Sequence, residues 1–121
     1  MAKLLIVDDE PDIRTTLRNI AETVDIQIEE AVDGKDGVAK AKKFLPDLIF
    51  LDVMMPGLKT KEILELLKAD TSTAKIPVVL ITVMRFSDKE LKAMLETTQI
   101  VNYIPKPFEI DSVIDTIKKH T

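Results

Sequence analysis

The chain has 121 residues, a length that fits one domain able to bury its own core, with 45% hydrophobic and 31% charged residues. It contains no cysteine, which excludes disulfides, thiol nucleophiles and thiolate metal sites. The formal net charge of −4 argues against direct binding of nucleic acid, and neither a membrane span nor a signal peptide is present, so we expect one cytoplasmic domain over residues 1–121 with no output domain.

Short apolar runs alternate with segments of helical period, a pattern typical of βαβ units around a parallel sheet. The apolar runs predict strands at residues 3–8, 26–31, 47–51, 77–81 and 101–104. The periodic segments predict helices at residues 11–22, 35–44, 58–69, 87–95 and 109–119. The first, third and fourth strands lack polar alternation and are expected to be covered on both faces. The second strand alternates, which predicts an edge position.

Two helix starts carry recognisable capping signals. Pro11 suits a first helical turn, where a missing N–H costs nothing, and Asp9 is a candidate for the cap of that turn. Ser87 and Glu90 have the spacing of a capping box and predict the start of the fourth helix.

Four of the apolar runs stop at residues that can do chemistry. Asp8 and Asp9 end the first run, and Asp52 ends the third. Thr82 ends the fourth run, and Lys106 follows the last. Sites in open α/β sheets are built at the carboxyl ends of the strands, so we expect these side chains to converge at one edge.

Three carboxylates at one edge require a compensating charge. Two carboxylates about 4 Å apart repel by roughly 4 kcal/mol at an effective dielectric near 20, so the cluster needs a cation or raised pKa values. Mg²⁺ prefers oxygen ligands and often binds through one or two carboxylates together with a phosphate. One carboxylate is then a candidate nucleophile for a phosphoryl group, with Lys106 neutralising charge and Thr82 donating a hydrogen bond.

Taken one at a time, these residues have simpler structural explanations. The aspartates after the first strand are candidates for a helix cap, and Asp52 is a candidate for a turn. Thr82 suits an ordinary strand position, and Lys106 could be one more surface lysine. These explanations would have to coincide at four strand ends, so the combined pattern favours a site.

The motifs VDDE, LDVMMP, PVVLIT and YIPKPF, in this order and at these separations, resemble the receiver domain of CheY-like response regulators. The resemblance covers almost the whole chain and implies a flavodoxin-like α/β fold, with a doubly wound five-stranded parallel sheet in the order 2-1-3-4-5. It implies a signalling phosphoacceptor that promotes only its own phosphorylation and dephosphorylation, not an enzyme with a separate substrate. The implied partners are a sensor histidine kinase or phosphotransfer protein and a downstream target protein.

The same resemblance implies roles for the acidic residues. Asp52 would accept the phosphoryl group from a phosphohistidine. Asp8, Asp9 and Asp52 would hold Mg²⁺, with Mn²⁺ as an alternative ion, and the backbone carbonyl of Met54 would complete the protein ligands.

Roles at the other strand ends are implied as well. Lys106 would pair with the phosphate, and the Lys106-Pro107 peptide would be cis. Thr82 and Tyr103 would form a switch pair that alters the surface of the fourth helix, fifth strand and fifth helix. Val83 departs from the family pattern, since a small residue commonly follows the switch threonine. Gln99 and Ile100 likewise replace a frequent Gly-Ala pair.

Two other classes of function remain open from the sequence. A pseudo-receiver would keep the fold and act as an interaction module without phosphorylation. A metal-dependent phosphohydrolase would use an aspartyl nucleophile, but it would usually need a second acid two positions later, where this chain has Met54.

Overall fold

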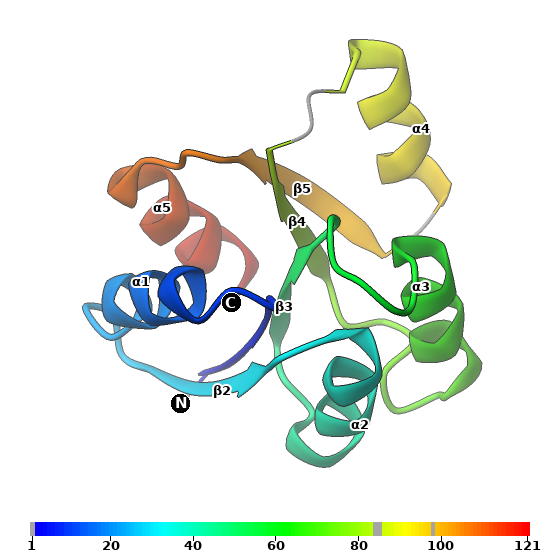
Figure 1. Ribbon diagram of the computed structural model, residues 1–121, viewed down its shortest axis with the longest axis horizontal. Coiled ribbons are helices and arrows are strands. Elements are labelled where there is room, and N and C mark those ends of the chain that lie inside the picture. The colour runs from blue at the N-terminus through cyan, green and yellow to red at the C-terminus, as the bar shows by residue number, and fades with distance from the viewer. Residues whose placement is uncertain (1, 84–85, 98) are drawn as a thin grey trace.

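The computed structural model describes residues 2–83, 86–97 and 99–121. A parallel sheet of five strands forms its centre, in the order β2-β1-β3-β4-β5 (Figure 1). Its strands are β1 (Ala2–Val7), β2 (Ile26–Ala31), β3 (Leu48–Asp52), β4 (Val78–Thr82) and β5 (Ile100–Pro105).

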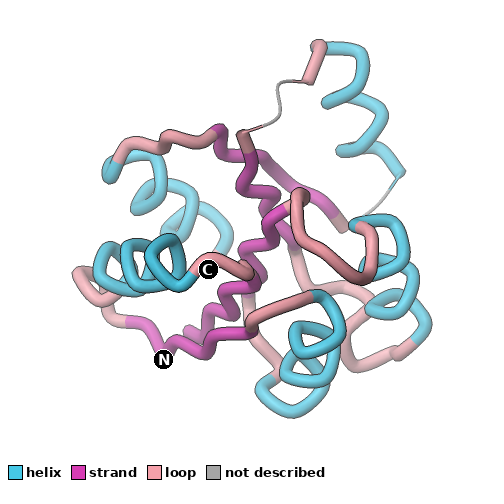
Figure 2. Tube along the Cα trace, in the orientation of Figure 1, coloured by secondary structure: helices cyan, strands magenta, loops and turns pink. Residues whose placement is uncertain are grey.

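Five helices connect these strands: α1 (Pro11–Ala21), α2 (Gly34–Phe44), α3 (Thr60–Ala69), α4 (Asp88–Thr97) and α5 (Ile110–His120). Helices α1 and α5 cover one face of the sheet, and α2 and α3 cover the other (Figures 1 and 2). Helix α4 projects beyond β5 on the side of α3 (Figure 1). In the described part of the chain, no helix is both long enough and apolar enough to cross a membrane.

The predicted architecture is confirmed in class, strand order and element order. Each predicted element is present, with boundaries that differ by at most two residues. The alternating strand β2 lies at an edge of the sheet, as predicted. The Lys106-Pro107 peptide bond is cis.

Two apolar clusters, one on each face of the sheet, form the core. Every residue of β3 is buried, with Ile49 and Leu51 in the cluster of the α2–α3 face and Leu48 and Phe50 in that of the α1–α5 face. Successive side chains of a strand point to opposite faces, so a strand covered on both faces has no polar alternation. Each fully buried side chain of this size contributes roughly 1.5–3 kcal/mol, which fixes the register of the strand ends.

One predicted cap is wrong and one is confirmed. The N-cap residue of α1 is Glu10, without a side-chain capping hydrogen bond, so Asp9 does not cap this helix. The Glu10 N–H instead donates to Asp8 Oδ1 at 2.9 Å, because the turn after β1 directs Asp8 back over it. At the start of α4, the Ser87 N–H donates to Glu90 Oε1 at 3.1 Å and the Glu90 N–H donates to Ser87 Oγ at 3.2 Å.

The turn before β5 is anchored by the side chain of Gln99. The Gln99 side-chain amide donates to the carbonyls of Thr73, at 3.2 Å, and Ile76. The Gln99 carbonyl also accepts from the Val78 N–H at 2.8 Å. These bonds tie the turn to the segment before β4. The register of β5 against β4 shifts at its start, where Val78 pairs with Ile100 and Val79 pairs with Asn102.

Candidate functional site

The carboxyl ends of four strands bring the predicted reactive residues to one edge of the sheet. Strand β3 ends at Asp52 and β4 ends at Thr82. Asp8 directly follows β1, and Lys106 directly follows β5. All strands are parallel, so these ends meet, and the Lys106 N–H donates to the Thr82 carbonyl at 2.8 Å.

Lys106 connects two buried carboxylates at this edge. Its Nζ lies 3.1 Å from Asp8 Oδ2 and 3.5 Å from Asp52 Oδ2. Asp8 is 1% exposed and Asp52 is 4% exposed, so both charges are largely removed from water. Asp8 at the end of β1 and Asp52 at the end of β3 thus share the ammonium group of Lys106.

The second carboxylate oxygen of each aspartate is held by a backbone N–H. Asp8 Oδ1 accepts from Glu10 at 2.9 Å, and Asp52 Oδ1 accepts from Met54 at 3.1 Å. The orientation of both carboxylates is therefore fixed from two sides. The Met54 side chain is exposed, and the predicted role of its backbone carbonyl as a metal ligand stays a prediction.

Four carboxylates gather here, one more than the sequence prediction included. Asp8, Asp9, Glu10 and Asp52 each offer a ligand oxygen, and these oxygens all lie within 4.8 Å of one another. Glu10 was missed, although it is the last letter of the VDDE motif, because only the aspartates are implied as ligands by the resemblance.

The donor set fits a hard divalent cation. Asp9 Oδ1 is buried and has no hydrogen-bond partner among the described residues. An orphaned buried oxygen is costly unless a cation or water satisfies it. Carboxylate oxygens are the ligands that Mg²⁺ and Mn²⁺ prefer, and Asp8, Asp9 and Asp52 are the residues that would hold the ion.

Burial and charge shift the ionisation of two groups in the site. Burial raises the pKa of Asp8 above its ordinary value, the Asp52 carboxylate adds to the rise, and the Glu10 N–H and Lys106 oppose it. Burial lowers the pKa of Lys106, but its hydrogen bond to Asp8 and the charges of Asp8, Asp52 and Glu10 outweigh this and raise it overall. Lys106 is thus held as a cation between the carboxylates.

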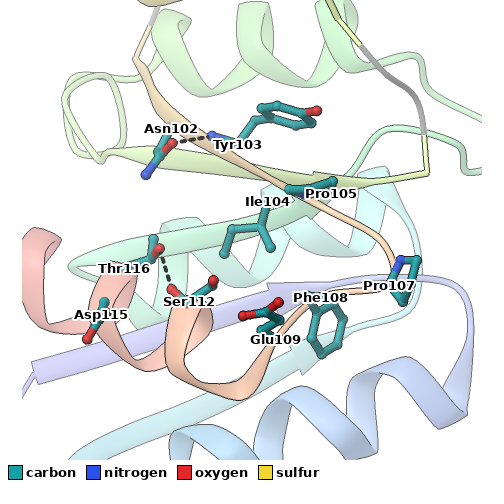
Figure 3. A pocket seen from close by; sticks show the side chains of 10 residues that line it. All are labelled: Asn102, Tyr103, Ile104, Pro105, Pro107, Phe108, Glu109, Ser112, Asp115 and Thr116. Atoms are coloured by element: carbon teal, nitrogen blue, oxygen red, sulfur yellow. Dashed lines mark hydrogen bonds between the residues drawn. The ribbon is translucent and has the colours of Figure 1, made fainter.

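The predicted switch residues occupy different positions relative to the acidic cluster. Thr82 is fully buried at the end of β4, next to the backbone of Lys106. Tyr103 lies three positions before Lys106 on β5 and is half-buried. Figure 3 shows its ring on the opposite side of β5 from Ile104, which faces α5. The Phe86 ring packs edge-on against Tyr103, with centroids 5.3 Å apart and an angle of 77°, a contact that the sequence did not predict.

Comparisons with known proteins agree with this fold. The family model described as response regulator receiver domain matches residues 4–118. Protein PilH of Pseudomonas aeruginosa is 34% identical over 118 residues, which cover 97% of this chain and 95% of PilH. Chemotaxis protein CheY of Listeria monocytogenes is 32% identical over 120 residues, which cover 98% of each chain.

A solved structure is also similar over the whole chain. The structure of the chemotaxis response regulator CheY4 of Vibrio cholerae matches with a TM-score of 0.87 and 26% sequence identity, covering 100% of this chain and 99% of CheY4. Sequence and fold thus agree. The chain belongs to the receiver domain family of response regulators, the signalling proteins of two-component systems.

Proposed function

We propose that Asp52 accepts a phosphoryl group from a phosphohistidine of a sensor kinase or phosphotransfer protein, in a reaction that depends on Mg²⁺. The observation that carries this proposal is the position of Lys106, whose ammonium lies within 3.5 Å of a carboxylate oxygen of both Asp8 and Asp52. An ammonium between a nucleophilic carboxylate and an acidic metal site is placed to neutralise an incoming phosphoryl group.

The chemical step takes place between Asp52 and the phosphoryl donor. A carboxylate oxygen of Asp52 attacks phosphorus while the P–N bond to the donor histidine breaks. The electron pair of that bond stays on the imidazole nitrogen, and the product is a mixed anhydride between Asp52 and phosphate. Mg²⁺, when bound, would neutralise charge on the transferring oxygens.

The chain's own residues orient the product. The Lys106 ammonium is expected to pair with one phosphoryl oxygen, and the Thr82 hydroxyl to donate to another. A movement of Thr82 would also displace neighbouring residues of β4 and β5, because Thr82 pairs with Pro105 and Leu80 pairs with Tyr103. We expect the Tyr103 ring to change its packing against Phe86 in response.

The output surface that we propose is formed by α4, β5 and α5. Figure 3 shows the part of it between β5 and α5, a pocket of about 480 Å³. It is lined by Asn102, Tyr103, Ile104, Pro105, Pro107, Phe108, Glu109, Ser112, Asp115 and Thr116. Tyr103 belongs both to this lining and to the proposed switch, which links the phosphoacceptor site to a downstream protein target.

Exposure to acetyl phosphate tests the phosphoacceptor proposal. With Mg²⁺ we expect one added phosphoryl group per chain by intact-protein mass spectrometry, located at Asp52 by peptide mapping. With a chelator we expect none, since the carboxylates would repel the donor. A chain that stays unmodified with Mg²⁺, and that shows no spectral change with beryllofluoride, would favour the pseudo-receiver.

Val83 is expected to slow access to the phosphoacceptor site. It directly follows Thr82 at the end of β4, and its branched side chain is 59% exposed. Replacement by alanine should speed phosphorylation by acetyl phosphate and loss of the phosphoryl group by about two- to fivefold, a barrier change below about 1 kcal/mol. Time courses of the phosphorylated fraction would measure both rates.

A matched control is Val101→Ala, which removes the same atoms from an exposed valine on β5. It should leave both rates unchanged. Equal rates in Val83→Ala and the original chain would show that Val83 does not limit access.

A further inference from the structure

Arg14 reaches from α1 to the backbone of the acidic turn. Its Nη1 donates to the Asp8 carbonyl at 2.7 Å, and its side chain is only 14% exposed. Helical side chains lean toward the N-terminus of their helix, which directs Arg14 from the second turn of α1 back over the end of β1. The guanidinium therefore binds the backbone of Asp8, three positions before α1 begins, and is largely shielded from solvent.

With this contact, the backbone N–H, the backbone carbonyl and both carboxylate oxygens of Asp8 all have hydrogen-bond partners. Its N–H donates to the Ala31 carbonyl at 3.1 Å, and its two carboxylate oxygens are held by Glu10 and Lys106. The Asp8 carbonyl and the Asp9 N–H belong to one planar peptide unit, so the bond from Arg14 fixes the orientation of that plane. The plane sets where the Asp9 side chain leaves the backbone.

Arg14 is itself held and neutralised from the neighbouring strand. Its Nε lies 3.4 Å from Glu30 Oε1, while Arg18 Nε donates to Glu30 Oε2. Lys40 of α2 donates to the Glu30 backbone carbonyl. Glu30 offsets the positive charge of Arg14, which would otherwise repel a cation in the acidic cluster. Arg14 therefore acts mainly by orienting the Asp8 backbone, and adds little net positive charge near the acidic cluster.

We propose that Arg14 is a positioning residue for the divalent cation: by binding the Asp8 carbonyl, it sets the Asp8–Asp9 peptide so that both carboxylates point into one site. This inference rests on the proposed function, since it assumes that Mg²⁺ binds there. Asp8 and Asp9 remain the ligands, and Arg14 acts only through them. Groups that orient metal ligands typically change metal affinity by about 10- to 100-fold when removed.

Calorimetric titration of the full chain with MgCl₂ tests the proposal. Arg14→Ala is expected to weaken Mg²⁺ binding by about tenfold. Arg14→Lys keeps a single donor for the Asp8 carbonyl and should recover part of the loss. Arg18→Ala is the matched control, because Arg18 shares Glu30 but has no bond to Asp8, and it should bind within about twofold of the original chain.

A second readout does not need the metal. In the metal-free protein, hydrogen exchange of the Glu10 amide reports whether its bond to Asp8 Oδ1 persists, and it should speed up in Arg14→Ala but not in Arg18→Ala. If Arg14→Ala keeps both the original affinity and the original exchange rate, or if Arg18→Ala loses as much, the positioning role is refuted. If the original chain itself binds no Mg²⁺, the proposed function fails first.

Discussion

Asp52→Asn is expected to abolish phosphorylation by acetyl phosphate with Mg²⁺ while leaving the fold intact. The amide is not a competent nucleophile toward phosphorus, so no anhydride can form at this position. Asparagine has nearly the same shape and can still accept the Met54 N–H bond that holds Oδ1 in the original chain. Loss of one charge next to Asp8 should keep or raise the unfolding temperature.

Intact-protein mass spectrometry and a test for acid-labile phosphate would measure this loss. Asp12→Asn is the control, because it removes an exposed carboxylate from the first turn of α1, outside the acidic cluster. It should be phosphorylated like the original chain. Acid-labile phosphate retained by Asp52→Asn would refute the assignment of the phosphoacceptor.

Most of the fold was predictable because the local sequence pattern indicates both whether a strand is buried and where it ends. The run Leu48–Leu51 has no polar residue, and it became a strand buried on both faces that ends at Asp52. The position of Lys106 near Asp52 was predictable as well. Strand β5 runs parallel to β3, so both strands end at the same edge of the sheet. Position along a parallel strand thus predicts which residues meet.

The parts that were missed depend on contacts between distant side chains. Glu30 binds Arg14, although the two residues are 16 positions apart in the sequence. No sequence pattern around either residue predicts this ion pair. Phe86 contacts the ring of Tyr103, which lies 17 positions further along the chain. The wrong cap at Asp9 has a different, local cause. Its neighbour Asp8 takes the Glu10 N–H, and Asp9 keeps an oxygen for the acidic cluster.

Asp8→Asn is expected to separate metal binding from stability. The acidic cluster holds four carboxylates and one ammonium, and the substitution removes one of the buried negative charges. Mg²⁺ affinity should fall on the order of a hundredfold, because a directly ligating carboxylate is lost. Phosphorylation by acetyl phosphate should fall with it. Calorimetric titration with MgCl₂ and phosphorylation time courses would measure the two losses.

Without metal, the same substitution should stabilise the fold at pH values above the folded pKa of Asp8. The pKa of Asp8 is raised in the folded chain, mainly by burial. A carboxyl whose folded pKa lies above its unfolded value contributes stability below the unfolded pKa, and this contribution is lost as pH rises through the folded pKa. Above the folded pKa of Asp8 the original chain has lost it. Asparagine stays neutral at every pH, so Asp8→Asn should be the more stable chain above the folded pKa of Asp8.

Urea unfolding in the presence of a chelator, at several pH values, would test this sign. The difference in unfolding free energy between Asp8→Asn and the original chain should grow as pH rises through the folded pKa of Asp8 and then level off. Added Mg²⁺ should reverse the order, because it stabilises only a chain that binds it. An Asp8→Asn chain that is less stable than the original without metal would mean that the bond from Lys106 outweighs the burial of the charge.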